Sequence, residues 1–293
     1  MKMIIAVLVV MFVCAGNVMA GAWTTINIPG GGTNLFGVSG NNMVGSSSRG
    51  GSFYDGTSWA TINYPGASSA VPYAISGNTI VGEYRGGTHS GPGKQGYGFI
   101  YDGTNWTTVD APGPNYTILC GISGNNIVGQ YTDASDNNHG YFYNGTSWAT
   151  LDYPGAGATY LQGISGTNIV GWEEGAPDGD NAFLYDGTTW KTLDMPGVNS
   201  WSIVPRGIDG SNIVGYYSAP DATHGFLYDG TTWTTLDYPG ALDTMVYGIS
   251  GGDIVGEYTD NSGNYGFLYT VPEPATLGLL SFGFLALVRR RRR

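Results

Sequence analysis

The feature that most constrains the fold of this chain is a motif that it contains six times. Each copy has the pattern W-x-T-[ILV]-[DN]-x-P-G, and successive copies begin 36, 47, 42, 42 and 43 residues apart. The tryptophans that open the copies are Trp23, Trp59, Trp106, Trp148, Trp190 and Trp233. A period of about 42 residues accommodates four short strands with their turns, the size of a propeller blade, and is too long for a hexapeptide β-helix.

Turn signals divide each repeat into four strands. A segment of the type [GA]-[IV]-[SD]-G-x-x-[IM]-V-G supplies two strands around a tight turn, and a short aromatic segment supplies a third. Asp-Gly or Asn-Gly then forms a tight hairpin into the Trp strand, which ends at Pro-Gly because proline cannot donate to a sheet ladder. With 50 glycines and only 11% charged residues, the chain favours strands and turns over helices.

The array of repeats begins and ends out of phase. The first copy starts with the Trp strand at residues 23–28, and the last copy stops after its third strand at residues 265–269. Pairing these complementary ends gives six complete sheets and leaves no unpaired blade edge. The sequence therefore predicts an all-β, six-bladed propeller of four-stranded antiparallel blades over residues 21–270, closed by contact between Trp23 and Tyr269.

Short hydrophobic helices are expected to flank this domain. Residues 1–20 place Lys2 before an apolar run at residues 4–13 and end at Ala20, which is the arrangement of a secretory signal peptide. Near the other end, residues 275–288 form an uncharged stretch followed by five arginines at 289–293. Fourteen helical residues span about 21 Å, short of the roughly 30 Å hydrocarbon core, and the arginines favour a cytoplasmic C-terminus.

The segment before the apolar stretch reads Val271, Pro272, Glu273 and Pro274. This order of VPEP, a short apolar helix and terminal arginines over residues 271–293 resembles the PEP-CTERM sorting signal. The resemblance implies that an exosortase recognises the signal, removes the tail and releases the protein to the cell surface or extracellular matrix after transient membrane anchoring. The alternative is a plain C-terminal anchor with a proline-rich hinge.

Two repeats carry a further signature. Gly129-Gln130-Tyr131 is followed by His139-Gly140-Tyr141, and Gly215-Tyr216-Tyr217 is followed by His224-Gly225-Phe226. These segments resemble extracellular HAF-type repeats, a family that implies an address and a fold but no reaction. Because the two histidines hold equivalent repeat positions, we expect them to be hydrogen-bonded or rim residues and not a functional site.

The net charge of the predicted domain limits the classes of molecule that it can bind. Residues 21–271 contain five basic and 21 acidic side chains, a net charge of −16. A surface of that sign repels phosphate backbones and anionic lipid headgroups, so we expect no nucleic-acid partner and membrane contact only through the C-terminal helix before processing. Divalent cations and extracellular polysaccharide remain compatible partners.

Blade topology predicts where a ligand would bind. The turns between the first and second and the third and fourth strands share one side of the disc, and all the longer connections lie on the other, where variable loops favour binding. Because the six motif tryptophans recur in one register, we expect them to pack rather than bind. The candidate ligand residues on the loop side are Trp172, Glu173, Glu174, Trp201 and Arg206.

No certain cofactor is expected, although two loops offer the oxygen ligands that Ca²⁺ prefers. One contains Asp178 and Asp180, and the other contains Asp133 and Asp136. Neither has a complete 12-residue calcium loop with its bidentate Glu, so a solvated acidic loop is the alternative. Cys120 is the single cysteine in residues 21–271. It takes a repeat position of varied residues, so we expect a half-buried filler and not a nucleophile.

Two functional hypotheses follow, with a purely structural protein as a third. The preferred one is a non-enzymatic cell-surface or exopolysaccharide-matrix protein that binds or scaffolds glycans. The alternative is a propeller hydrolase or lyase acting on polysaccharide through Glu173, Asp178 or Asp180. The chain has no GxSxG, HExxH, CxxC or GxxxxGK[ST] motif, so we expect no catalytic residues.

Overall fold

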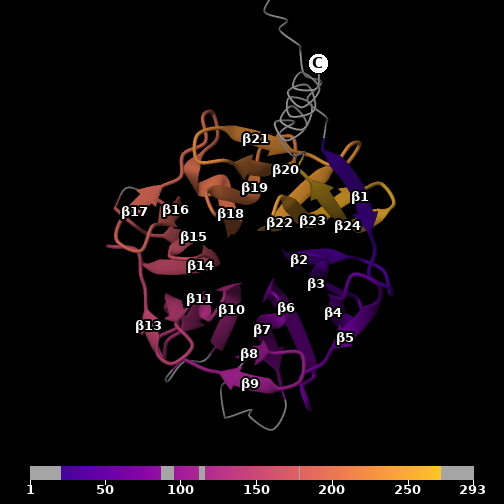
Figure 1. Cartoon of the computed structure of the whole chain (residues 1–293). Helices are drawn as coiled ribbons and strands as arrows, with labels where there is room; N and C mark the ends of the chain where they lie inside the picture. The colour runs from indigo at the N-terminus through magenta and orange to yellow at the C-terminus, as the bar shows by residue number, and fades with distance from the viewer. Residues whose placement is uncertain (1–20, 87–95, 112–115, 178, 272–293) are drawn as a thin grey trace, which may run out of the picture. The chain divides into compact units, whose positions relative to one another are not determined.

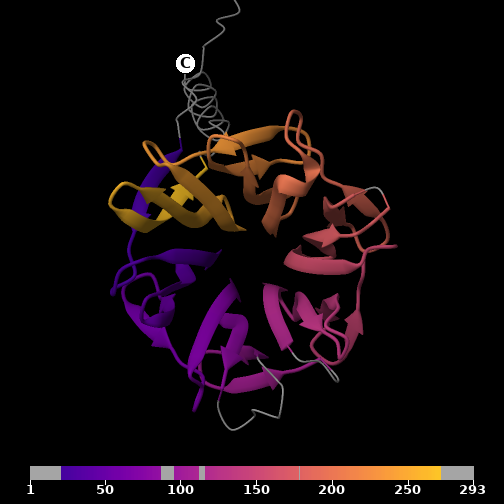
Figure 2. The ribbon, with the colours of Figure 1, turned by 180° about the vertical axis from the view of Figure 1, so that it is seen from behind.

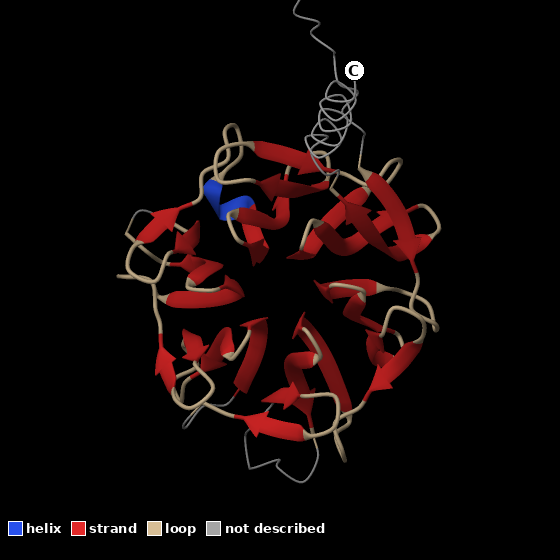
Figure 3. Cartoon of the chain, in the orientation of Figure 1, coloured by secondary structure: helices blue, strands red, loops and turns tan. Residues whose placement is uncertain are grey.

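The computed structural model describes residues 21–86, 96–111, 116–177 and 179–271. Within these residues the chain forms 24 strands in six four-stranded sheets, together with one short 3-10 helix, η1 (Ser200–Ser202). Figure 1 shows the sheets as blades arranged in a ring, and Figure 3 shows η1 in blue. The predicted six-bladed propeller is confirmed, whereas the predicted terminal helices lie outside the described residues.

Each blade is an antiparallel meander that runs from the centre of the ring to its rim. The innermost strands are β2 (Asn34–Ser39), β6 (Ser69–Ser76), β10 (Tyr116–Ser123), β14 (Ala158–Ser165), β18 (Ile203–Asp209) and β22 (Asp243–Ser250). The second strands are β3 (Asn42–Ser47), β7 (Thr79–Arg85), β11 (Asn126–Thr132), β15 (Asn168–Glu174), β19 (Asn212–Ser218) and β23 (Asp253–Asp260).

The two outer positions follow the same order around the ring. The third strands are β4 (Gly50–Tyr54), β8 (Tyr97–Tyr101), β12 (Asn138–Tyr143), β16 (Asn181–Tyr185), β20 (Thr223–Tyr228) and β24 (Gly263–Thr270). The rim strands are β5 (Trp59–Ile62), β9 (Trp106–Val109), β13 (Trp148–Thr150), β17 (Trp190–Thr192), β21 (Trp233–Leu236) and, for the last blade, β1 (Ala22–Ile26). We number the blades 1 to 6 by their inner strands, β2 to β22.

The N-terminal strand closes the ring as predicted. β1 lies beside β24 in the order β1-β24-β23-β22, and Figures 1 and 2 show the indigo strand against the yellow blade from both sides. The rings of Trp23 and Tyr269 have centroids 4.6 Å apart. The hydroxyl groups of Thr25 and Tyr238 lie 2.7 Å apart, which adds a polar contact at the junction.

Loops sort onto two sides as the blade topology predicts. On one side the two tight turns of a blade touch: a Cβ added to Gly56 in the β4–β5 turn would lie 3.1 Å from the Cβ of Asn41 in the β2–β3 turn. On the other side, in blades 1, 2, 4 and 6, the chain at the end of the second strand is hydrogen-bonded to the connection from the preceding blade. The Gly157 amide, for example, donates to the Glu174 carbonyl at 2.7 Å.

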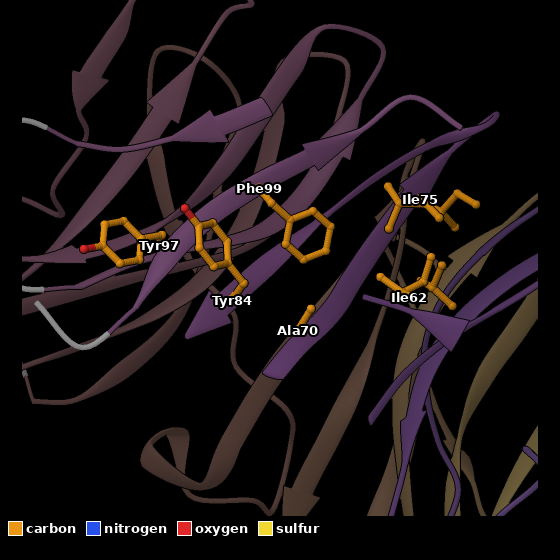
Figure 4. Close-up of a cluster of buried hydrophobic side chains, with 8 residues drawn as sticks. Ile62, Ala70, Ile75, Tyr84, Tyr97 and Phe99 are labelled. Atoms are coloured by element: carbon orange, nitrogen blue, oxygen red, sulfur yellow. The ribbon is translucent and has the colours of Figure 1, made fainter. Parts of the chain in front are cut away.

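The hydrophobic core lies between neighbouring blades. Figure 4 shows the cluster between blades 1 and 2, where Ile62 of β5 lies near Ile75 of β6 and Phe99 of β8. Phe99 is fully buried, and a Cβ on Gly82 of β7 would lie 2.9 Å from its ring. Burying an aromatic side chain of this size contributes about 1.5–3 kcal/mol, so each junction is a small core of its own.

The motif tryptophans pack against neighbouring rings, which confirms the packing interpretation. Trp106 contacts Tyr64, in the connection from the preceding blade, and Tyr101 in its own blade, with ring centroids 5.3 and 4.4 Å apart. Trp148 is the least covered, at 41% exposed. Ala111 stands in its preceding connection where Tyr64 stands before Trp106, so no large ring covers it there.

Glycine allows the inner strands to approach one another around the axis. A Cβ on Gly163 would lie 2.8 Å from the carbonyl oxygen of Arg206 and 3.2 Å from the Cα of Gly207 in the next blade. Such distances leave no room for a side chain without movement of backbone atoms. The same repeat position is held by Gly37, Ala74, Gly121, Gly163, Gly207 and Gly248.

We expect Gly163→Ala to lower the free energy of unfolding by about 1–3 kcal/mol, because the added methyl overpacks the junction between blades 4 and 5. The measurement is urea unfolding of the secreted protein. The matched control is Gly157→Ala in the same blade, whose Cβ would meet only the Glu174 carbonyl oxygen at an ordinary 3.4 Å. Equal stability of the two variants would show that close approach at the axis is unimportant.

Candidate functional site

A β-bulge in every inner strand directs one side chain toward the axis. In β18, for example, the pairing with β19 shifts between Pro205 and Gly207, which leaves Arg206 as the extra residue. A bulge re-aims the side chain of its extra residue, and here that position is free to vary between repeats. The six bulge residues are Phe36, Tyr73, Cys120, Gln162, Arg206 and Tyr247.

The bulge residues line an axial pocket of about 310 Å³. Its wall also includes Gln130 of β11 and a band of small and aliphatic residues such as Ile164. Burial raises the pKa of the Cys120 thiol to about 12, which suits a packing role and not a nucleophile. The axial pocket is therefore a mixed surface of aromatic rings, amides and one guanidinium group.

Two carboxylates lie behind tyrosines of this ring. The Tyr247 hydroxyl donates to Glu257 Oε1 at 2.8 Å, and the Tyr73 hydroxyl donates to Glu83 Oε1 at 3.3 Å. Burial raises the pKa of Glu257 above its ordinary value, although the Tyr247 hydrogen bond opposes this. Tyr116 also donates to Glu83. Tyrosine hydroxyls thus hold both carboxylates in the wall of the propeller, and Arg85 also donates to Glu83 Oε1 at 3.4 Å.

A second pocket, of about 210 Å³, lies between blades 4 and 5. We call it the interblade pocket. It brings together four residues that the sequence analysis singled out, and it adds others that the sequence did not single out. The predicted ones are Trp172, Glu173, Asp180 and Arg206, and the added ones are Asn181, Ser200, Ile203, Val204 and Tyr216.

Trp172 forms an aromatic wall of the interblade pocket. Its ring stacks on Tyr160 of β14, with centroids 3.9 Å apart and planes 13° from parallel. Trp172 lines the pocket and Tyr160 does not, so Tyr160 supports the ring from behind. This arrangement fixes the orientation of a large aromatic surface beside polar groups.

Glu173 is fully buried. Its carboxylate accepts hydrogen bonds from the Asn181 side chain at 3.1 Å and from the Ala176 amide at 3.2 Å. Asp180 is exposed and accepts from the Gly175 amide at 2.8 Å. Glu173 therefore holds the β15–β16 loop in place together with the buried Asn181, and Asp180 is the exposed polar group beside them.

Arg206 connects the two pockets because it lines both. Its Nη1 donates to Gln162 Oε1 at 2.7 Å and its Nη2 donates to the Tyr216 hydroxyl at 3.0 Å. Neither Gln162 nor Tyr216 was predicted. Their repeat positions could have pointed to them. Gln162 holds the bulge position and Tyr216 follows the V-G pair, and at both positions the side chain differs between blades although the flanking motif is kept.

The other predicted ligand residues lie apart from the interblade pocket or are not described. Glu174 is exposed at the end of β15, where the Tyr160 hydroxyl donates to it at 3.4 Å. Trp201 belongs to η1, and its side chain lies outside the described residues, as does Asp178. Of the sorting residues only Val271 is described, and Pro272, Glu273 and Pro274 are not.

Asp133, one of the proposed calcium ligands, is engaged in other interactions. One Asp133 oxygen accepts the amides of Ser135 and Asn137, at 2.7 and 2.9 Å, and the other accepts the Asn137 side-chain amide. Asp136 has a positive φ of 64° in the same turn. The described part of the chain contains no group of three or more His, Cys, Asp or Glu side chains arranged to hold a metal ion.

The two histidines are hydrogen-bonded, as predicted. His139 Nδ1 lies 2.8 Å from Asp152 and its Nε2 lies 3.4 Å from Asp133, and His224 bridges Asp237 and Asp221 in the same way. Burial alone would lower the pKa of each imidazole. The hydrogen bonds and charges of the flanking carboxylates outweigh burial, so both pKa values lie above the ordinary 6.5.

Comparisons with known proteins add one sequence finding. Residues 270–293 match the PEP-CTERM protein-sorting motif. This motif indicates export, a C-terminal membrane anchor before processing and a surface or extracellular destination. Across the described residues, no helix has the length and hydrophobicity needed to cross a bilayer. No curated protein matches the chain significantly.

Several solved propellers resemble the structure at low sequence identity. The SapL1 lectin, in complex with alpha methyl fucoside, has 16% identity and a TM-score of 0.49, covering 83% of this chain and 97% of the lectin. A mutant Aleuria aurantia lectin, in complex with Fucalpha1-6GlcNAc, has 14% identity and a TM-score of 0.45, with the same coverage. Trypanosoma rangeli sialidase has 12% identity and a TM-score of 0.47, covering 81% of this chain and 54% of the sialidase.

The raised pKa of His139 predicts how stability depends on pH. A group whose pKa rises on folding stabilises the fold most below its unfolded pKa and loses that contribution as pH increases through its folded pKa. We therefore expect His139→Gln to be less stable than the wild type near pH 5.5, by about 1 kcal/mol or less for this partly exposed site. The difference should shrink as the pH passes above the folded pKa. Urea unfolding across this range measures it, and a constant difference would contradict the assignment.

Proposed function

We propose that this chain is a non-enzymatic, exported protein of the cell surface or exopolysaccharide matrix, and that its propeller binds glycans in the interblade pocket. In this proposal residues 1–20 are a signal peptide, and an exosortase processes the C-terminal tail. The resemblance to HAF-type repeats agrees with an extracellular address and stays a prediction.

The observation that carries the binding proposal is the combination of groups around Trp172. A saccharide has apolar C–H faces that pack on an aromatic ring, and hydroxyls that need hydrogen-bond partners at the ring's edge. The stack on Tyr160 fixes the Trp172 ring. Asp180, Asn181 and Ser200 line the same pocket and offer carboxylate, amide and hydroxyl groups.

The hydrogen bonds of Glu173 favour binding over catalysis. A glycosidase needs two carboxyl groups that reach the scissile bond on opposite sides. Glu173 is fully buried and accepts hydrogen bonds from Asn181 and Ala176, so its oxygens are engaged within the loop. Asp180 alone does not make a catalytic pair, and Asp178 lies outside the described residues.

We expect the secreted protein to bind exopolysaccharide from its own host, and Trp172→Ala to weaken binding at least about tenfold by removing the stacking surface. Trp148→Ala is the matched control, because Trp148 is an exposed tryptophan on the rim of another blade. Isothermal titration calorimetry measures binding, and thermal melting confirms that both variants fold.

Absence of polysaccharide binding by the wild type would contradict the proposal, as would unchanged affinity of Trp172→Ala. A reducing-end assay tests the alternative with the same polysaccharide. Release of reducing ends by the wild type that is lost in Glu173→Gln would establish a hydrolase or lyase in place of a binding protein.

Processing makes a separate prediction. The intact mass of the exported protein should correspond to the loss of residues 1–20 and of the tail that follows the Val271–Pro274 region. Replacing Pro272, Glu273 and Pro274 with alanine should leave the tail attached and the protein in the membrane fraction. An exported wild-type protein that keeps its terminal arginines would contradict exosortase processing.

A further inference from the structure

Arg206 is a cation at the centre of a strongly acidic protein. Residues 21–271 have only five basic side chains against 21 acidic ones. Among the six bulge residues that surround the axial pocket, Arg206 alone carries a charge, and none of the residues that line this pocket is acidic. Arg206 is therefore the one charged side chain among the described residues that line the axial pocket, and the carboxylates of Glu83 and Glu257 lie behind its tyrosines.

The partners of the Arg206 guanidinium are neutral. Gln162 and Tyr216 accept from its two terminal nitrogens, and its Nε is buried without a hydrogen-bond partner. The rings of Tyr216 and Tyr247 flank it, with their centroids 5.5 and 5.7 Å from its Cζ. Within the described residues no carboxylate oxygen lies within 4.0 Å of it.

Arg85, in contrast to Arg206, is exposed and has a carboxylate partner. Its side chain is 55% exposed and lies 3.4 Å from a carboxylate oxygen of Glu83. A charge that is removed from water without a counter-ion is costly, even where dipoles and aromatic faces offset part of the cost. An anion that enters the axial pocket would supply the missing counter-ion to Arg206.

A second unsatisfied group lines the same pocket. Gln130 Oε1 is buried and accepts no hydrogen bond. Together with Arg206 Nε, it accounts for the buried side-chain polar atoms without partners in the described part of the chain. One is a donor on a cation and the other is an acceptor, so a complementary ligand has an anionic acceptor and a hydroxyl donor.

The two pockets differ in the charge that they tolerate. Glu173 and Asp180 line the interblade pocket and would repel an anion there, whereas the axial pocket has no acidic lining residue. At about 310 Å³, the axial pocket reaches the lower end of the roughly 300–1,000 Å³ range of small-ligand pockets. A carboxylate is thus favoured on the axial side of Arg206, and uncharged hydroxyls on the Trp172 side.

We propose that the axial pocket binds the carboxylate and a hydroxyl of an acidic sugar, so that the glycan recognised by this propeller contains uronic acid. Arg206 pairs with the carboxylate, and Gln130 accepts from a hydroxyl. This inference rests on the proposed glycan-binding function and names the class of sugar.

The test compares matched acidic and neutral sugars with the secreted protein. We expect calorimetry to show D-galacturonate or D-glucuronate binding at least about tenfold more tightly than D-galactose or D-glucose, because only the acids pair with Arg206. Arg206→Gln should remove this preference. Arg49→Gln is the matched control, since Arg49 is an exposed arginine in the β3–β4 turn that lines neither pocket, and this variant should keep the preference.

Gln130→Glu is a second variant that retains Arg206 and should also abolish the preference, because a new acid in the axial pocket competes with the ligand's carboxylate. Equal binding of acidic and neutral sugars to the wild type would overturn the inference while leaving glycan binding intact. A preference for acids that survives in Arg206→Gln would also overturn it. Failure of all four sugars and of host polysaccharide to bind would instead overturn the proposed function. Binding of tartrate without either uronate would overturn the assignment to a sugar.

Discussion

Backbone contact between inner strands sets the geometry of the whole ring. At five of the six junctions a glycine precedes the aliphatic residue of the inner strand, and the sixth has Ala74. The absence of side chains lets neighbouring blades meet at the axis, while fully buried residues such as Phe99 fill the wider space toward the rim. This taper from glycine to aromatic side chains makes each blade a wedge. Six wedges then close the circle and leave a pocket at its centre.

A β-bulge lies just before the glycine or alanine of each inner strand. Its backbone geometry is common to all the blades, whereas its side chain varies. The backbone shift recurs in all six blades, yet its extra residue is a different side chain almost every time. A symmetric scaffold can therefore present an asymmetric set of groups around one axis. In this chain the asymmetry is greatest where Gln162 and Arg206 meet between blades 4 and 5. There the charged, aromatic and amide side chains of both pockets come together.

The fold could be predicted from the sequence because turn-forming residues mark the strand boundaries. The Asp-Gly and Pro-Gly pairs mark the strand ends, and the unpaired first and last strands require closure. The sequence also predicted part of the candidate site: Trp172, Glu173, Asp180 and Arg206 share one pocket. It did not foresee the burial of Glu173, because whether a loop carboxylate faces solvent depends on the amides and side chains that its own loop folds around it. Nor does the sequence show that the Asp133 carboxylate, a proposed calcium ligand, accepts hydrogen bonds from nearby N–H groups. The exposure of Trp148 likewise depends on Ala111, which lies in another repeat.

The position of β1 in the last blade has a consequence for the order of events during export. β1 is the first strand of the domain, and its partner β24 ends at Thr270, only a few residues before the apolar stretch. Residues from opposite ends of the domain must meet before either edge is covered. During export of the chain from its N-terminus, the ring therefore stays open. β1 has no partner until β24, near the end of the domain, has also crossed the membrane. Assembly of the circle is thereby coupled to completion of transport.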